Sequence, residues 1–263
     1  MSVLQVQHVK KFFGTKKILD NINFSVNAGE CLGIVGLSGG GKSTLARIIA
    51  RLIDCDGGQI FLCGEDITHA TGNAFYRNMQ MIFQTPEDSF DPRRTLGASI
   101  AEPIKNFKSL ELEALSFKEN TPLKAQSSKL KAKVEKLLAE VGLSKNYAER
   151  YPREVSGGEC QRAAIARAIS VEPKLLICDE ATSALDVTIQ AQVVALIKNL
   201  CVKKNIACLF ITHDLALLPK IADRVIVLHN GCIVEQGTPR QLITDAQSSF
   251  TRQLMATDFF ATT

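Results

Sequence analysis

The sequence has no long apolar run, no closely spaced cysteine pair and no basic tract, and each absence narrows the function. No apolar stretch in the 263 residues reaches the roughly 18 residues that would span a bilayer. The first residues, MSVLQVQHVKK, lack the basic and then apolar pattern of a signal peptide. We therefore expect a cytoplasmic chain whose membrane role, if it has one, is peripheral and depends on partners.

The cysteine positions and the charge distribution bear on the cellular compartment and on the expected partners. Eight cysteines are present but form no C-x-x-C pair, and Cys31, Cys178 and Cys208 lie inside apolar runs. We interpret them as reduced core residues of a cytosolic protein. The net charge of +4 is spread along the chain, so nucleic acid is not an expected partner. With 46% hydrophobic residues, the chain can bury the core of one large domain or of two modest ones.

Two kinds of apolar pattern predict an α/β fold. LQVQHV, NINFSV and QIFLCGED resemble half-buried antiparallel strands, the first two with apolar and polar residues in alternation. CLGIVG, MQMIF, LLICDE, ACLFIT and RVIVL are nearly continuous apolar runs, typical of strands buried on both faces of a parallel sheet. Helical spacing is present over 128–142 and 189–200, residues 116–128 read as an exposed loop, and the Asn230–Gly231 pair predicts a hairpin.

The segment GLSGGGKS, from Gly36 to Ser43, fits the pattern G-x-x-x-x-G-K-[ST] between an apolar strand and the helical run TLARIIARLI. In that context backbone N–H groups and the positive end of a helix face a triphosphate. Lys42 can reach the β and γ phosphates, and the Ser43 hydroxyl can bind Mg²⁺. Glycine is expected because a Cβ would hold the phosphate away. The predicted residues of this loop are Gly36, Ser38, Gly39, Gly40, Gly41, Lys42, Ser43 and Thr44.

A second segment, KLLICDEATSALD, supplies the carboxylates that nucleotide hydrolysis requires. Its apolar strand ends at Asp179, which is placed to contact Mg²⁺. Glu180 follows, where a general base that activates water would stand. Together with the glycine loop, this pair predicts a site that binds a nucleoside triphosphate with Mg²⁺ and hydrolyses it.

The motifs together resemble a known family over nearly the whole chain. VSGGECQR, from Val155 to Arg162, resembles the LSGGQ signature of ABC ATPases and stands shortly before LLICDE, as it does there. SALD and ITHD follow in the family's order. The resemblance implies a P-loop fold of the ABC ATPase type, with a mostly parallel sheet, an antiparallel β subdomain and a helical subdomain. It implies one domain, 1–263, with a nucleotide-binding core over 1–84 and 171–263 and a helical subdomain over 85–170.

The resemblance also implies roles for single residues. Phe13, in KFFG, resembles the aromatic that stacks on adenine, although Phe12 competes for that role. Gln84 resembles the glutamine that contacts Mg²⁺ and relays movement to the membrane partner, and His213 resembles the histidine that steadies the γ-phosphate. The remaining implied contacts, to the nucleotide of the opposite subunit and within the SALD loop, are Ser156, Gly157, Gly158 and Asp186.

Two signature positions depart from the family pattern. Val155 replaces the leading leucine, which is a mild change, and Glu159 replaces the final glutamine. An anionic acceptor near a phosphate should weaken binding unless its side chain points away. We expect slower turnover at that composite site, without loss of activity.

Within the family, MIFQTPEDSFDPRRT and the ending SSFTRQLMA resemble the ATP-binding subunits of importers of dipeptides, oligopeptides and nickel. The compact length and the segment IACLFITHDL look closer to the nickel ATP-binding subunits. Implied partners are transmembrane permease subunits, a second ATPase subunit and, indirectly, an extracytoplasmic solute-binding protein. The second ATPase subunit is either a paralogue, which we favour, or another copy of this chain. The chain would lie on the cytoplasmic face of the membrane.

Other classes of nucleotide-binding protein agree less well with these motifs. An exporter, or an importer of other cargo, stays open. A DNA-repair ATPase would need a long heptad insertion, and a translation factor would need two cassettes. A kinase would lack SGGE and SALD, and a non-catalytic regulator would be expected to lack Glu180 or His213.

Overall fold

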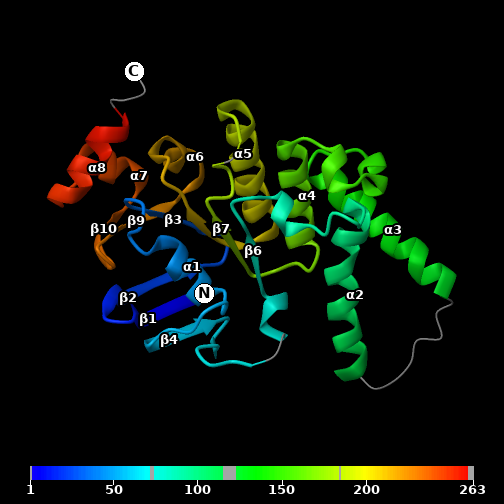
Figure 1. The fold of residues 1–263 in the computed structure, drawn as a ribbon, viewed down its shortest axis with the longest axis horizontal. Coiled ribbons are helices and arrows are strands. Elements are labelled where there is room, and N and C mark those ends of the chain that lie inside the picture. Colours follow the sequence, from blue (N-terminus) through cyan, green and yellow to red (C-terminus); the bar gives the residue numbers. More distant parts are fainter. Residues whose placement is uncertain (1, 72–73, 115–122, 184, 260–263) are drawn as a thin grey trace.

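The structure is a computed structural model that describes residues 2–71, 74–114, 123–183 and 185–259. A small antiparallel sheet lies on one side of a larger, mostly parallel sheet (Figure 1). Figure 1 also shows a group of helices beyond the edge of the larger sheet that is formed by β6 (Met79–Ile82). The predicted α/β fold class is confirmed.

The antiparallel sheet has the strand order β2-β1-β4-β5. Its strands are β1 (Ser2–Phe13), β2 (Lys16–Asn27), β4 (Gly57–Leu62) and β5 (Glu65–Asp66). In the first pair Leu4 faces Val26 and Val6 faces Phe24, so the alternating apolar side chains share one buried face. That face packs with helix α1 (Lys42–Ile49) against the larger sheet.

The larger sheet has the order β10-β9-β3-β8-β7-β6 and is parallel except for β10. Its strands are β3 (Cys31–Val35), β6 (Met79–Ile82), β7 (Leu175–Asp179), β8 (Ala207–Ile211), β9 (Arg224–His229) and β10 (Cys232–Gly237). Every residue of β3, β7 and β8 is buried, as the continuous apolar runs predict. The predicted hairpin at Asn230–Gly231 is confirmed, with φ angles of 47° and 76°.

Two sets of helices accompany the sheets. Beside the larger sheet lie α5 (Val187–Lys204), α6 (Leu218–Ile221), α7 (Pro239–Thr244) and α8 (Ser249–Phe259), with the 3-10 helices η1 (Ala74–Arg77) and η5 (Leu215–Leu217). The group between β6 and β7 contains α2 (Leu96–Ala114), α3 (Leu123–Glu140) and α4 (Gly157–Ile169), joined through η2 (Glu87–Ser89), η3 (Lys145–Glu149) and η4 (Pro152–Glu154). Figure 1 shows α2 and α3 projecting away from the sheets.

Two predicted helix boundaries are wrong. The run after the glycine loop is helical only as far as Ile49, because Arg51 adopts a left-handed backbone with φ 56°. Helix α3 begins at Leu123 rather than Ser128. The predicted exposed loop over 116–128 therefore includes helical residues from 123 onward, and its part up to residue 122 lies outside the described residues.

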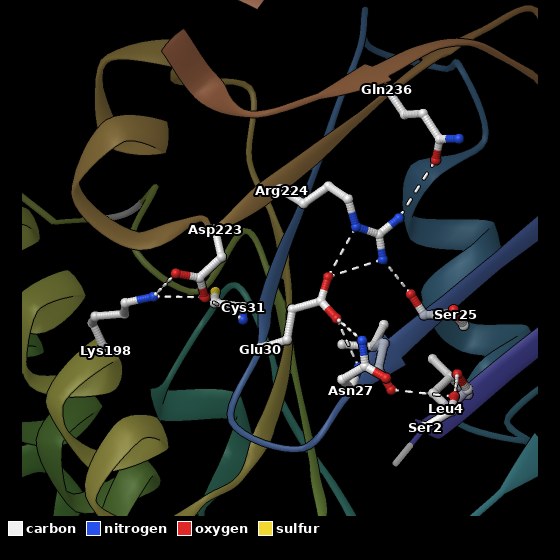
Figure 2. Close-up of polar contacts among 11 residues, drawn as sticks. Ser2, Leu4, Ser25, Asn27, Glu30, Cys31, Lys198, Asp223, Arg224 and Gln236 are labelled. Atoms are coloured by element: carbon white, nitrogen blue, oxygen red, sulfur yellow. Dashed lines mark hydrogen bonds and ion pairs between the residues drawn. The ribbon is translucent and has the colours of Figure 1, made fainter. Parts of the chain in front are cut away.

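A polar network fixes the beginning of β3 against strands that come much later in the chain (Figure 2). Asp223 accepts a hydrogen bond from the Cys31 N–H at 2.8 Å and forms an ion pair with Lys198 at 2.7 Å. Glu30 accepts from the Arg224 Nε–H at 2.9 Å. The network thus anchors the beginning of β3, the strand that leads into the glycine loop at Gly36.

The remaining expectations about composition can be checked on the same structure. The eight cysteines are free, and Cys31, Cys178 and Cys208 are buried, as predicted. Among the described residues, no helix has both the length and the apolar character needed to cross a membrane.

Candidate active site

The predicted phosphate loop connects the end of β3 to the start of α1. Gly36, Ser38, Gly39, Gly40 and Gly41 lie in the loop, and a turn closes where the Gly40 N–H donates to the Leu37 carbonyl at 3.1 Å. The three residues that follow it, Lys42, Ser43 and Thr44, form the first turn of α1.

The glycines of this loop are required partly by the protein itself. A Cβ at Gly36 would lie 2.1 Å from the Leu228 carbonyl oxygen. Gly41 has a φ of 97°, and a Cβ there would lie 2.8 Å from Leu19 Cδ2. At Gly39 a Cβ would meet nothing within 4 Å, so this residue faces open space. The sequence argument that the glycines make room for a phosphate therefore fits Gly39, whereas Gly36 and Gly41 pack against the chain.

Lys42 points back into the loop. Its Nζ donates to the carbonyl oxygens of Gly36 at 2.9 Å and Leu37 at 3.0 Å. Burial lowers the pKa of Lys42, and the nearby carboxylates of Glu180 and Asp179 oppose that shift. The ammonium group is thus held in the concave side of the loop, near both acidic residues.

Ser43 and Asp179 form the pair expected for a metal site. The Ser43 hydroxyl donates to Asp179 Oδ1 at 3.0 Å, and burial raises the pKa of Asp179 against the effect of this bond. A hydroxyl and a carboxylate are the hard oxygen ligands that Mg²⁺ prefers. In the described part of the chain no three His, Cys, Asp or Glu side chains are arranged to hold a metal. The donor set therefore fits Mg²⁺ that takes its other ligands from phosphate and water.

Glu180 and His213 come together at the ends of neighbouring strands. Strands β7 and β8 pair Asp179 with Ile211, and the Glu180 N–H continues the ladder to the Ile211 carbonyl at 3.0 Å. Glu180 Oε1 lies 3.5 Å from His213 Nδ1. Glu180 also has a left-handed φ of 50°, which is uncommon for a residue other than glycine and is concentrated at functional sites.

Gln84 leaves the sheet at the same edge. Strand β6 pairs Ile82 with Cys178 of β7, so Gln84 and Glu180 each stand two residues beyond that pair. The Gln84 side chain is exposed. The parallel register thus brings Gln84, Asp179, Glu180 and His213 to the edge where the phosphate loop leaves β3.

Phe13 ends β1, and its side chain is 53% exposed, against 40% for Phe12. Asp56 accepts the Phe12 N–H at 2.6 Å and pairs with Lys11, whose Nζ lies 5.5 Å from the centre of the Phe13 ring. Both rings are accessible for stacking. Asp56 is a supporting residue that the sequence reasoning missed, and its separation of 44 residues from Phe12 left no local signal.

Ser156, Gly157 and Gly158 form the beginning of α4. Ser156 is the N-cap residue, and its hydroxyl oxygen accepts the Glu159 N–H at 3.4 Å. Glu159 Oε2 accepts the Ser156 N–H at 2.8 Å, and Oε1 accepts from the Tyr147 hydroxyl. The Glu159 side chain therefore bonds within its own chain, which removes the premise of the predicted slower turnover. Tyr147 was not predicted.

Asp186 caps the next helix, and its Oδ1 accepts the Ile189 N–H at 3.0 Å. A Cβ added at Gly158 would lie 2.7 Å from Ile189 Cγ2, and one at Gly157 would lie 3.7 Å from Leu185. The signature segment therefore packs on the start of α5 in the same chain. The SALD loop includes residue 184, which lies outside the described residues.

Comparison with known proteins agrees with this geometry. A family model described as ABC transporter matches residues 19–183. The chain is 42% identical over 245 residues to the Oligopeptide transport ATP-binding protein OppF of Haemophilus influenzae, covering 92% of this chain and 70% of that protein. It is 40% identical over 262 residues to OppF of Bacillus subtilis, covering 97% and 81%.

A solved structure carries the same fold. It is described as a dimeric ATP-binding cassette in a post-hydrolysis state, bound to ADP and phosphate. It superposes with a TM-score of 0.73 at 23% identity, covering 90% of this chain and 99% of that one. The chain therefore belongs to the ABC transporter family and is one of its ATPases.

Proposed function

We propose that this chain uses MgATP hydrolysis to drive the import of oligopeptides through a membrane transporter. The observation that carries the proposal is the distance of 3.5 Å between Glu180 and His213, at the strand ends that also hold the Ser43–Asp179 pair. This arrangement supports the assignment of Glu180 as an acid–base group, of His213 as a charge-stabilising ring and of Ser43 and Asp179 as a metal-binding pair around one phosphate loop.

The chemistry follows from these positions. The backbone N–H groups from Gly39 to Ser43 and the Lys42 ammonium bind the phosphates, and the exposed ring of Phe13 stacks on adenine. Glu180 orients a water molecule and accepts its proton as the oxygen attacks the γ-phosphorus. The bond to ADP breaks, and His213 stabilises the charge on the transferred group. Ser43, Asp179 and Gln84 would hold Mg²⁺, which when bound would neutralise charge on the phosphates.

A second subunit completes the site. Across the described residues, no hydrogen bond or ion pair connects Ser156–Gly158 with Gly36–Ser43, which supports the view that the signature serves the nucleotide of a partner. We propose that a paralogous ATPase subunit supplies that partner, and that residues 85–170 form a helical subdomain. The subdomain is supported by the bond from the Leu96 N–H to the Arg150 carbonyl, at 2.9 Å, which joins α2 to the segment before α4.

Oligopeptides are the preferred cargo because both relatives described above are named for oligopeptide transport. The resemblance to nickel ATP-binding subunits rests only on the compact length and the segment IACLFITHDL. The partners would be transmembrane permease subunits and, on the outer side, a solute-binding protein. The chain would lie on the cytoplasmic face of the membrane, bound through these permease subunits.

The test is uptake of a labelled tripeptide and of labelled nickel in cells that carry the native chain, Glu180→Gln, or the control Glu65→Gln. Glu65 is exposed in β5, in the small antiparallel sheet. We expect Glu180→Gln to abolish tripeptide uptake and to leave nickel uptake unchanged, with the control at the native level. Loss of nickel uptake alone would assign the chain to metal import, and no change in either would refute the importer function.

A further inference from the structure

The carboxylate of Glu159 has both oxygens occupied by groups of its own chain. Oε2 accepts the Ser156 N–H at 2.8 Å, and Oε1 accepts from the hydroxyl of Tyr147. The hydrogen bonds from Tyr147 and Ser156 hold the pKa of Glu159 below its usual value. At neutral pH the side chain is therefore an anion, and it already accepts hydrogen bonds from two donors of its own chain.

These bonds define the orientation of Ser156. Its backbone N–H is held by the Glu159 carboxylate, and its hydroxyl oxygen accepts the Glu159 N–H. A hydroxyl that accepts one hydrogen bond still has its own hydrogen to donate. The next N–H groups, of Gly157 and Gly158, stand at the first helical positions, where no intrahelical acceptor exists. The end of α4 thus presents a set of aligned donors.

Tyr147 is itself anchored to the helices that follow Gln84. The guanidinium of Arg150 stacks 4.4 Å from the centre of its ring, and the Arg150 carbonyl accepts the N–H of Leu96, the first residue of α2. A Cβ at Gly97 would lie 2.6 Å from the Ala148 carbonyl, so α2 and η3 are in close contact. The Glu159–Tyr147 bond therefore connects the signature with the start of α2.

We propose that Glu159 and Tyr147 are positioning residues that hold Ser156 in the orientation needed by the partner subunit's nucleotide and tie it to α2. This inference rests on the proposed function, because the nucleotide that Ser156 reaches belongs to that proposal. Neither residue touches the nucleotide. Glutamine at position 159 could keep the arrangement, since its carbonyl would accept the Ser156 N–H and its amide would donate to the Tyr147 oxygen.

The experiment compares five variants, each purified as the isolated full chain and as the assembled transporter. They are Glu159→Ala, Glu159→Gln, Tyr147→Phe, the double variant Glu159→Ala with Tyr147→Phe, and the control Glu154→Ala. Glu154 makes a similar cap, accepting the Tyr151 N–H at 2.8 Å, but has no bond to Ser156. The measurements are ATP turnover of the transporter, ATP affinity of the isolated chain, and hydrogen exchange of the Ser156 amide.

We expect Glu159→Ala to lower kcat of the transporter about fivefold. A fivefold change corresponds to about 1 kcal/mol, which is the typical free-energy cost of one lost helix-cap interaction. Its isolated chain should bind ATP as tightly as the native chain, because its own phosphate loop is untouched, and its Ser156 amide should exchange faster. Glu159→Gln and Glu154→Ala should stay near the native kcat, and Tyr147→Phe should fall between. The double variant Glu159→Ala with Tyr147→Phe should lose no more than Glu159→Ala alone.

The inference is overturned if Glu159→Ala keeps native turnover, if Glu159→Gln falls as far as Glu159→Ala, or if Glu154→Ala falls equally. It is also overturned if the isolated Glu159→Ala chain loses ATP affinity in proportion to kcat, since that is general destabilisation. A transporter with Glu180→Gln is included in the same assay. ATP turnover at the native rate by that variant would refute the proposed function, independently of the result for Glu159.

Discussion

Replacement of Gly158 by alanine tests whether the signature glycine is required by packing inside the subunit. A Cβ there would lie 2.7 Å from Ile189 Cγ2, about 1 Å inside an ordinary carbon–carbon contact. Overpacking of this kind costs about 1–3 kcal/mol, and the helix preference of alanine over glycine returns up to about 1 kcal/mol. We expect a net loss near 1 kcal/mol, or a Tm lower by about 2–4 °C in a chain of this size.

Second-site changes at Ile189 give the decisive comparison. Ile189→Ala leaves only the Cβ, which is 3.8 Å from the new methyl group and thus at a normal distance. Ile189→Val removes one methyl group but keeps Cγ2, so it is the matched control. In thermal unfolding monitored by circular dichroism, Gly158→Ala should be much less destabilising in the Ile189→Ala background than in the native or Ile189→Val background. Equal effects in all three backgrounds would refute the packing argument.

Two further predictions concern supporting carboxylates. Although burial alone would raise the pKa of Glu235, hydrogen bonds from the N–H groups of Gln247 (2.7 Å) and Ser248 (3.0 Å) contribute to a lowered pKa. The ionised carboxylate therefore stabilises the fold at pH values above its usual pKa of 4.5. In denaturant titrations, the difference in unfolding free energy between the native chain and Glu235→Gln should disappear as the pH falls below that value. A difference that stays constant with pH would contradict this. Asp56→Ala removes the acceptor of the Phe12 N–H and should weaken binding of ATP, measured by calorimetry, about threefold to tenfold. Binding of inorganic tripolyphosphate should not change, and an equal loss for both ligands would show that the phosphate loop itself is disturbed.

The sequence predicts best what depends on neighbouring residues. Phosphate loop, buried strands and the Asn230–Gly231 hairpin are local patterns, and each lies where the pattern indicates. The end of α1 could not be predicted, because the sequence around Arg51 contains no signal for a left-handed backbone. The order β10-β9-β3-β8-β7-β6 follows from contacts between distant segments rather than from any local pattern.

The site shows the same division. Lys42, Ser43, Asp179, Glu180 and His213 could be identified because each belongs to a short motif, and the parallel register brings the strand ends together. The residues that support them are not in motifs. Tyr147 is twelve positions from Glu159, and their bond depends on how η3 lies on α4. The direction of the Glu159 side chain, on which the expected turnover depended, could be read only from the structure.

The network around β3 also governs when this protein can become functional during its synthesis (Figure 2). The two strands that neighbour β3 in the sheet are β8 and β9. Asp223 and Arg224, which anchor the beginning of β3, stand more than 190 positions later in the chain. A nascent chain that has emerged only through β7 has the letters of the phosphate loop but neither flanking strand. We therefore expect ATP binding to begin only after residues through His229 have left the ribosome; until then the apolar β3 lacks both of its neighbouring strands.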